Sequence, residues 1–442
     1  MKSYFYKLLY TYISFYAAPE ASVVEIGPQH DLLINLFPNA RKAQYVPDET
    51  RRSSPEKMVL SSLEEVAGFS PDFLVLNGNL HYEKDLQRLL TKLHSVCNRK
   101  TRLIVTYYSG LWRPLMRLAT KLRMRHHTPE QNWIAHEDVD NLLRLTDFEV
   151  IQRSHRILCP IYIPVLSHAV NRYFAPLPFF RLFTMVNVLV ARPLYGKQGP
   201  SAKPSVSIVV PAKNEAGTLE SLIRRIPKMG LDDEIIIIEG HSTDDTWRVL
   251  KDLQKKYSST AHIVLARQDG KGKGDAVRKG FDLATHELLM VFDADLSVMP
   301  EDLPKFYDAL NEGKGEFING SRLVYQVNEK AMRFWNLVGN KFFAAMFSFL
   351  VGQRFKDTLC GTKALTREQY LKIAEHRSYF GEFDPFGDFD LIFGACRLGM
   401  KIVEIPVQYQ PRTYGVTNIQ RWRHGLLLFR MLVFAARKIT FL

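Results

Sequence analysis

The sequence predicts an α/β protein of two domains, and three observations carry this prediction. The chain has 442 residues, which is long for a single domain. Short apolar runs alternate with helical runs in both halves, as in parallel sheets with helices between the strands. A segment without periodicity, RPLYGKQGPSAKPS, separates the halves at residues 192–205. We therefore expect domains at residues 1–192 and 206–420, a linker at 193–205 and a terminal helix at 421–442.

The composition is that of a folded protein with an anionic partner. Hydrophobic residues make up 46% of the chain and charged residues 24%, which excludes a disordered chain. The 59 Lys and Arg exceed the 46 Asp and Glu, so the formal charge is +13, which fits a nucleotide, a lipid head group or a nucleic acid. We expect no nucleic-acid partner, because no binding motif or dense basic run with stacking aromatics occurs. Four cysteines without a CxxC pair predict neither disulfides nor a zinc site, which favours a reducing, cytoplasmic compartment.

In the first half, apolar runs and one amphipathic run set the expected elements. We expect strands at Ser22–Ile26, Asp72–Leu76 and Arg102–Thr106, and a helix at Asp85–Val96. This βα alternation predicts a parallel sheet.

The order VVEIGPQHDLL, SPDFLVLNGNLHYEKDLQRLLTKL, RLIVTYY and DVDNLLRLTDFEVIQ resembles class I S-adenosylmethionine-dependent methyltransferases over about residues 20–192. The resemblance implies a Rossmann-like sheet with S-adenosylmethionine near Glu25, Gly27 and Asp48. The three residues after Gly27 are PQH, where that family has further glycines that let the backbone approach the cofactor. The fold is therefore expected, while cofactor binding and methylation stay open.

The second half repeats the alternation with more strongly apolar runs. Strands are expected at Val206–Pro211, Glu234–Glu239, His262–Ala266 and Leu288–Phe292. Ligands bind at the carboxyl ends of such strands, so the polar residues that follow them are the first candidates for a site. They include Pro211, Asn214, Glu215, Glu239 to Asp245, Asp269 to Asp275, and Asp293 to Ser297.

Two of these clusters have a pattern with a defined chemistry. In VFDADLS, Asp293 and Asp295 flank Ala294, and two such carboxylates can hold Mg²⁺ or Mn²⁺ and leave positions for diphosphate oxygens. The alternative is that they cap the next helix. In DGKGKGD, a glycine-rich turn with Lys273 precedes a helix expected at Asp275–Ala284, whose N-terminal amides suit an anion. The alternative is a solvated turn.

The order VPAKNE, EGHSTDDT, GKGKGDA, FDADLS, GSR and IVEIPVQYQPRTYG resembles the family 2 glycosyltransferases of GT-A fold, from residue 206 to about 430. Within them it is most similar to the dolichyl- or polyprenyl-phosphate sugar synthases. The resemblance implies Mg²⁺ or Mn²⁺ on Asp293 and Asp295, and an acceptor phosphate near Arg412 and, by a looser match, Arg333. It implies that the nucleotide sugar, of GDP-mannose or UDP-glucose type, is bound by Pro211, Asn214, Glu215, Glu239, Lys273, Asp293, Ala294 and Arg322.

The acceptor decides which carboxylates take part in the reaction. A lipid phosphate is already anionic at neutral pH and hardly requires a base, whereas a hydroxyl acceptor requires one. FGEFDPFGDFDLIFG offers Glu382, Asp384, Asp388 and Asp390, and Asp390 has the spacing that the resemblance requires. Asp388 and Asp390 are the candidates for the base, with helix capping as the alternative role of Asp388. With Asp295 they form the candidate catalytic set for an inverting hexosyltransferase. A hydroxyl acceptor, with or without methylation by the first domain, and an inactive scaffold are the alternatives.

Two apolar segments point to a membrane surface. Charged residues interrupt every long apolar stretch, so no spanning helix is expected. In residues 421–442, Arg423, Arg430 and Arg437 recur every seven residues beside apolar faces, which predicts either an interfacial helix or a helix packed on the enzyme. The resemblance places Phe342–Val351 near a lipid acceptor. We expect peripheral attachment at the cytoplasmic membrane face and leave the oligomeric state open.

Overall fold

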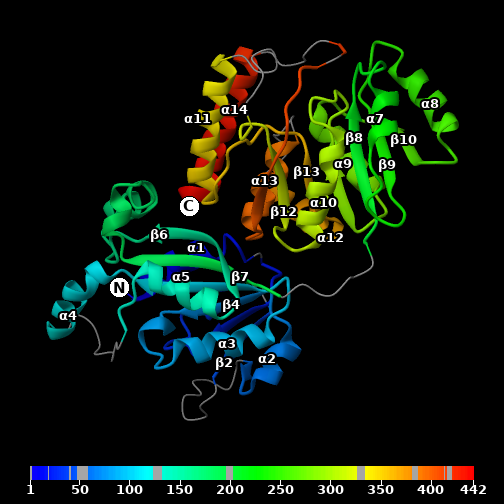
Figure 1. Cartoon of the computed structure of the whole chain (residues 1–442). Helices are drawn as coiled ribbons and strands as arrows, with labels where there is room; N and C mark the ends of the chain where they lie inside the picture. Colours follow the sequence, from blue (N-terminus) through cyan, green and yellow to red (C-terminus); the bar gives the residue numbers. More distant parts are fainter. Residues whose placement is uncertain are drawn as a thin grey trace. The chain divides into compact units, whose positions relative to one another are not determined.

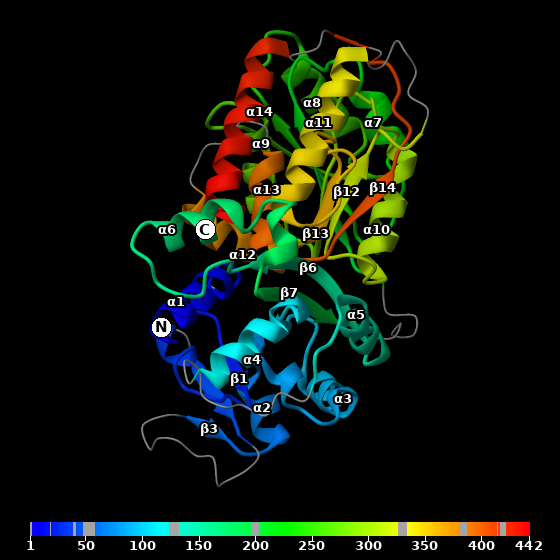
Figure 2. The same cartoon turned by 90° about the vertical axis from the view of Figure 1, so that its left-hand side faces the viewer.

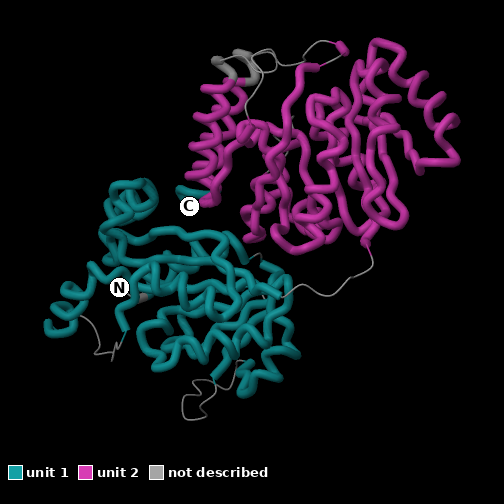
Figure 3. Tube along the Cα trace, viewed as in Figure 1, with its two compact units in different colours: residues 1–196, 439–442 teal, residues 197–438 magenta. Residues whose placement is uncertain are grey.

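The structure is a computed structural model of the chain (Figure 1). It describes residues 2–17, 19–38, 41–46, 58–122, 132–195, 203–325, 334–380, 387–412, 414–415 and 421–442. The chain divides into two compact units (Figure 3): unit 1 is Met1–Gly196 with Ile439–Leu442, and unit 2 is Lys197–Lys438. The division falls within residues 193–205. Within the described residues, each unit contains one seven-stranded sheet.

The unit 1 sheet has the order β3-β2-β1-β4-β5-β7-β6. Its strands are β1 (Val23–Ile26), β2 (Lys42–Tyr45), β3 (Val59–Leu60), β4 (Phe73–Asn77), β5 (Arg102–Tyr108), β6 (Phe148–Arg156) and β7 (Val186–Pro193). The first five in this order are parallel, and β7 runs antiparallel to both β5 and β6. Chain order reverses between β1 and β4, and ligands of doubly wound sheets bind at the carboxyl ends of such a pair.

The helices of unit 1 follow the strands as the alternation predicts. They are α1 (Lys2–Ile13), α2 (Leu63–Phe69), α3 (Leu86–Val96), α4 (Arg113–Lys121), α5 (His136–Leu145) and α6 (Leu166–Ala169), with short turns η1 (Ile34–Leu36), η3 (Asn79–His81), η4 (Gly110–Trp112), η5 (Val170–Phe174) and η6 (Phe180–Phe183). α3 begins after Asp85, whose carboxylate accepts a hydrogen bond from the Arg88 amide. Its Leu86, Leu90 and Leu93 are buried against the core of the unit, which explains the helical apolar spacing.

The unit 2 sheet has the order β10-β9-β8-β11-β13-β12-β14. Its strands are β8 (Val206–Ala212), β9 (Glu234–Glu239), β10 (His262–Arg267), β11 (Leu288–Val291), β12 (Phe317–Ser321), β13 (Lys363–Thr366) and β14 (Ile402–Pro406). The first four in this order are parallel. β13 runs antiparallel to β11 and β12, and β14 is parallel to β12. The sheet is therefore mixed, with a parallel half that carries the predicted motifs.

Helices cover the unit 2 sheet, and two of them pair with each other. They are α7 (Leu219–Arg225), α8 (Thr246–Lys256), α9 (Lys273–Leu283), α10 (Leu303–Asn311), α11 (Phe334–Val351), α12 (Arg367–Glu375), α13 (Asp388–Arg397) and α14 (Arg421–Ala435), with η7 (Pro300–Asp302), η8 (Arg377–Tyr379) and η9 (Ala436–Thr440). α11 and α14 lie side by side (Figure 2). Among the helices described, none has both the length and the apolar character needed to cross a bilayer.

Two glycines let α9 approach its neighbours closely. A Cβ at Gly280 would overlap the side chain of Val209 on β8, so the helix lies directly against this strand. Gly387 has φ +74°, and a Cβ there would lie 2.6 Å from Cα of Gly274. The first turns of α9 and α13 are therefore in contact, which brings Lys273 and Asp388 to the same place.

Candidate active site

The carboxyl ends of β8, β9 and β11 bring the polar residues of unit 2 to one edge. The strands are parallel and in register, with Ala212 beside Glu239 and Val209 beside Val291. The loop after β8 carries Asn214 and Glu215, and the loop after β11 carries Asp293 and Asp295. The predicted residues that follow these three strands therefore lie at one edge of the sheet.

Asp293 pairs with Lys273 at the first turn of α9. Nζ of Lys273 lies 2.5 Å from Oδ1 of Asp293. Burial by itself would raise the pKa of Asp293, but Lys273 holds it below its usual value. Burial likewise opposes the charge of Lys273, while Asp293 and Asp388 raise its pKa. A Cβ at Gly361 would overlap both groups, so this glycine is what allows the chain before β13 to cover the pair.

Arg412 joins the loops after β8 and β11. Its Nη1 lies 2.8 Å from Oε1 of Glu215, and its Nη2 lies 2.9 Å from Oδ2 of Asp295. The other Asp295 oxygen, Oδ1, accepts the Ser297 amide at 3.0 Å. Oε2 of Glu215 is buried without a hydrogen-bond partner in the described residues. Burial raises the pKa of Glu215 to about 7, with Asp295 adding to the effect and Arg412 opposing it.

The residues at this edge fit a divalent cation held jointly with a ligand. The described residues contain no group of three or more His, Cys, Asp or Glu placed to enclose a metal ion. Asp293 and Asp295 are nevertheless hard oxygen donors of the kind that Mg²⁺ and Mn²⁺ take when phosphate oxygens and waters supply the other ligands. A metal ion on Asp295 would compete with Arg412 for Oδ2.

Glu239 and Asn214 shape the turn that follows β9. Glu239 is buried, and its Oε1 accepts the Ser242 amide while its Oε2 lies 3.4 Å from Nε of Arg267. Asn214, at φ +57°, accepts the Thr243 amide at 2.7 Å. Both predicted nucleotide-binding residues thus hold the loop in place, and Pro211 lies in β8, paired with Ile238.

Arg322 is fixed by an acidic residue that the motifs do not indicate. Its Nε and Nη2 lie 2.7 Å and 2.9 Å from the two carboxylate oxygens of Asp357, which is fully buried. The guanidinium also lies over the ring of Tyr409, 5.1 Å from its centroid. Burial opposes the charge of Arg322, but Asp357 raises its pKa. The polar run KDTLCGTK after the apolar α11 was the available signal for Asp357.

Asp388 and Asp390 point to different partners. Asp388 begins α13 and lies 2.6 Å from Nζ of Lys363, a lysine buried in β13. Asp388 also raises the pKa of Lys273, so it lies near the Asp293 pair. The sequence pattern did not single out Lys363, although a lysine inside an apolar strand requires an acidic partner.

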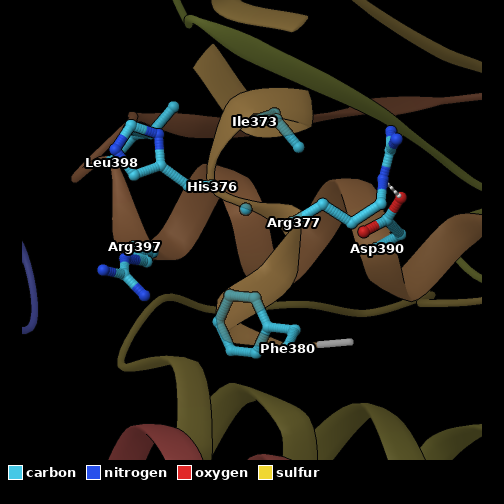
Figure 4. A pocket seen from close by; sticks show the side chains of 8 residues that line it. Ile373, His376, Arg377, Phe380, Asp390, Arg397 and Leu398 are labelled. Carbon is cyan, nitrogen blue, oxygen red and sulfur yellow. Dashed lines mark hydrogen bonds and ion pairs between the residues drawn. The ribbon is translucent and has the colours of Figure 1, made fainter. Parts of the chain in front are cut away.

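Asp390 belongs to a separate ion pair. Its Oδ2 lies 2.8 Å from Nε of Arg377 (Figure 4). With His376, Phe380 and Arg397 the two residues line a cavity of about 10 Å³ between α12 and α13. The structure therefore brings Asp388 towards Asp293, and Asp390 towards Arg377. Arg333, Glu382 and Asp384 lie outside the described residues.

The corresponding edge of unit 1 holds the residues that the first resemblance selects. Glu25 lies on β1, buried near Gln44 of β2 and Asn77 of β4, and burial raises its pKa to about 7. Gly27 has φ +49°, and a Cβ there would lie 3.1 Å from Nδ2 of Asn79. That amide donates to the carbonyls of Ile26 and Gly27, so it covers the turn after β1. Asp48 lies outside the described residues.

Comparisons with known proteins concern unit 2. Residues 207–371 match the family model described as Glycosyl transferase family 2. Glycosyltransferase AglJ of Haloferax volcanii is 32% identical over 227 residues, which cover 51% of this chain and 70% of that protein. Dolichol-phosphate mannosyltransferase of Pyrococcus furiosus is 30% identical over 226 residues, or 49% of this chain and 59% of that protein.

A shorter relative and solved structures cover a similar share of the chain. Polyprenol monophosphomannose synthase of Mycolicibacterium smegmatis is 26% identical over 219 residues, 48% of this chain and 80% of that protein. A crystal structure of glucosyl-3-phosphoglycerate synthase from Mycobacterium tuberculosis with phosphoglyceric acid has 21% identity and a TM-score of 0.39, covering 53% of this chain and 80% of that one.

Proposed function

The chain belongs to glycosyltransferase family 2, and we propose that it transfers a hexose from a nucleotide sugar to a polyprenyl phosphate. The family follows from the similarity to AglJ and the match over residues 207–371. The names of two relatives, a dolichol-phosphate mannosyltransferase and a polyprenol monophosphomannose synthase, support the lipid phosphate acceptor. A donor of GDP-mannose or UDP-glucose type fits both the family and the cationic site.

The donor diphosphate would bind where cations and carboxylates alternate. Lys273 and Arg412 supply positive charge on either side of Asp293 and Asp295. Mg²⁺ or Mn²⁺ held by these two aspartates would stabilise negative charge on the departing diphosphate. Lys273 and Arg412 are placed to neutralise the remaining phosphate oxygens, and Arg322, locked by Asp357, contributes a fixed guanidinium.

The ion pairs formed by Asp388 and Asp390 are the observation that supports a phosphate acceptor over a hydroxyl acceptor. Asp388 and Asp390 both form ion pairs, with Lys363 and Arg377, so each of the two candidate bases already has a cation as its partner. A lipid monophosphate needs no such base, because its oxygen is anionic at neutral pH. This oxygen would attack the anomeric carbon as the bond to the nucleoside diphosphate breaks, with inversion at that carbon.

The helices α11 and α14 support peripheral attachment at the cytoplasmic membrane face. α14 buries Leu428, Met431 and Leu432 but exposes Leu426 and Phe429 on the rest of its surface. α11 exposes Phe342. Both expected roles of the terminal helix are thus compatible, since one face packs and another presents apolar side chains.

A hydroxyl acceptor is the second candidate, and Glu215 is the observation that favours it. Glu215 also pairs with a cation, Arg412, through Oε1, but its buried Oε2 has no partner among the described residues and burial raises its pKa to about 7. Such a carboxylate is the kind of group that accepts a proton from a hydroxyl at neutral pH. With a hydroxyl acceptor, the first domain would methylate the same product or serve only as a scaffold. Its doubly wound strand order is compatible with a methyltransferase-like fold.

The test is a transfer assay with the full chain. Purified protein with Mg²⁺ or Mn²⁺ is given a panel of nucleotide sugars, with and without polyprenyl monophosphate, and products are followed by mass spectrometry. We expect equal amounts of nucleoside diphosphate and lipid-linked hexose from one donor, and loss of both with EDTA. Donor turnover without lipid product would favour the hydroxyl acceptor, and no turnover of any donor would contradict a transferase.

A further inference from the structure

Helix α4 of unit 1 turns a row of leucines to the solvent. Leu115 and Leu118 lie on α4, Leu111 lies in the turn η4 before it, and Leu122 directly follows it. They follow each other at intervals of four, three and four residues, so they lie on one side. All four are exposed, Leu111 by 65% and Leu115 by 54%. Met116 is the buried residue of this helix. The side of α4 that packs on the rest of unit 1 is thus narrow, and the leucines lie on another side of the helix.

A second apolar element is the segment of residues 157–185 between β6 and β7. Asn171 is buried within it and closes the segment on itself: its Oδ1 accepts the amides of Leu158 and Cys159, both at 2.9 Å, and its Nδ2 donates to the Cys159 carbonyl at 2.8 Å. Oγ of the buried Ser167 similarly bonds the Ile163 carbonyl at 2.8 Å. Its own hydrogen bonds therefore hold the segment in a defined conformation. We call residues 157–185 the protrusion.

The protrusion presents large apolar and aromatic side chains on its outside. Val165 is 84% exposed and Phe179 is 68% exposed. The exposed set is Ile161, Tyr162, Ile163, Val165, Leu166, Tyr173, Phe174, Phe179, Leu182 and Phe183. Nε1 of Trp112, at the start of α4, donates to the Phe183 carbonyl at 2.8 Å, so the protrusion and α4 are joined. We call this set, with the four leucines on and beside α4, the apolar surface of unit 1; Figure 2 turns its helices α4 and α6 towards the viewer.

All charged residues in the two sequence stretches that form this surface are basic. Arg113, Arg117 and Lys121 follow each other every four residues, on the flank of α4 next to its leucines, and all three are exposed. The chain contains no Asp or Glu between Asp85 and Glu130, and none between Glu149 and Glu215. Both elements of the surface lie within these two acid-free stretches. An apolar face with basic residues along its side is typical of segments that bind anionic bilayers.

We propose that the apolar surface of unit 1 docks on an anionic lipid bilayer. The leucine, phenylalanine and tyrosine side chains would enter the boundary between head groups and acyl chains, and Arg113, Arg117 and Lys121 would lie at the phosphate level. Exposure of so many large apolar side chains on a well-bonded scaffold is costly in water and indicates a binding surface. This role belongs to unit 1 and does not rest on the transfer reaction of unit 2.

The first experiment measures binding of the full chain to vesicles of phosphatidylcholine with 30% phosphatidylglycerol. Leu115→Glu/Leu118→Glu is compared with Leu145→Glu, which changes a leucine on α5 that is 57% exposed and lies outside the surface. We expect the double variant to bind the vesicles more than tenfold more weakly and the control to bind like the parent chain. Equal binding by the double variant and the parent would overturn the proposal, as would a parent chain that does not bind the vesicles.

The second experiment tests the cations. Arg117→Ser/Lys121→Ser is compared with Arg88→Ser/Lys92→Ser, which removes two exposed cations from α3. On the anionic vesicles, each lost cation of α4 should weaken binding about fivefold, and the effect should shrink with added salt. Equal losses in the two variants would show a response to net charge alone and overturn the placement on α4.

Two further readouts separate docking from misfolding and from other occupants. Hydrogen exchange of the parent chain should slow at residues 110–122 and 161–183 when vesicles are added, which a merely structural role would not produce. Phe429→Glu changes the exposed face of α14: if it abolishes vesicle binding while the α4 variants bind normally, the unit 1 proposal fails and the membrane role of unit 2 stands. A change from dimer to monomer in Leu115→Glu/Leu118→Glu without loss of vesicle binding would instead assign the surface to self-association.

Discussion

The two sheets have the same alternating construction, yet their carboxyl edges differ in the partners that surround an acid. In unit 2, Asp293, Asp295 and Asp388 each pair with a lysine or arginine. In unit 1, the groups that set the pKa of Glu25 are amides, a backbone group and another carboxylate, with no cation among them. The comparison teaches that cations beside the acids distinguish the edge of unit 2, where we propose that phosphates bind, from the edge at Glu25, where burial favours the neutral acid.

The strongest test of this contrast removes one acid of a buried pair. Asp388→Asn would leave Lys363, which is 1% exposed, without its anionic partner. We expect the free energy of unfolding to fall by about 3–5 kcal/mol, measured by urea denaturation.

The matched control is Asp388→Asn/Lys363→Met, which removes both charges and should recover most of the loss. If the single variant is as stable as the parent chain, the pair is not important for stability, and the contrast with Glu25 fails.

The next largest effect is expected on the rate of transfer. Asp295→Asn keeps the shape but removes the negative charge, so transfer should fall by about 10²- to 10³-fold, the range seen when one charge-stabilising group is lost. Release of nucleoside diphosphate is the readout. Asp252→Asn, which changes an exposed acid of α8 outside the candidate residues, should keep the parent rate. An unchanged rate in folded Asp295→Asn would remove this residue from the catalytic set.

Replacing the acid Glu25 of unit 1 by its amide should stabilise the chain, whereas Asp388→Asn in unit 2 should destabilise it. Burial raises the pKa of Glu25 from 4.5 to about 7, so the folded state binds the proton more tightly than the unfolded state. Between these two pH values stability falls as the pH rises, because only the folded state still binds the proton. Glu25→Gln should therefore stabilise the chain by about 3 kcal/mol at pH 8 and hardly at all at pH 4. Thermal unfolding at both pH values checks this, and destabilisation at pH 8 would contradict it.

The smallest expected effect concerns the shape of the cation at position 412. Arg412→Lys keeps the charge but cannot bond Glu215 and Asp295 at the same time, so we expect about a tenfold slower transfer. Arg225→Lys is the control, because Arg225 makes a similar two-point contact with Glu301 on an exposed surface. Equal rates for the parent and Arg412→Lys would show that charge alone matters there.

The sequence predicted the parallel strands well, because burial on both faces leaves continuous apolar runs. Val206–Ala212 and Glu234–Glu239 end within one residue of the expected positions. β6 and β7 were not predicted, and for β6 the reason is that it carries polar residues such as Arg153 and a bulge between Val150 and Gln152. Hydrophobic periodicity holds no information on such an irregular strand.

The candidate site was predictable in its motifs but not in its pairings. Asp293 and Asp295 follow directly from a strand end, which local spacing reveals. The partnership of Arg412 with Glu215 joins residues that are 197 positions apart, and no local pattern encodes it. Asp388 and Asp390 are two residues apart on α13, yet neighbours from β13 and η8 separate their environments.

The membership of Ile439–Leu442 in unit 1 has a consequence for synthesis on the ribosome. Nη1 of the buried Arg156, on β6, donates a hydrogen bond to the Thr440 carbonyl at 2.6 Å, so a side chain of the first unit takes its partner from residues made after unit 2. Unit 1 emerges first but is completed last, after all of unit 2 has been made. Unit 2 is thus an insertion between two pieces of unit 1, and a nascent chain that has not yet reached residue 440 can form all strands of the first sheet but lacks this hydrogen-bond partner for Arg156.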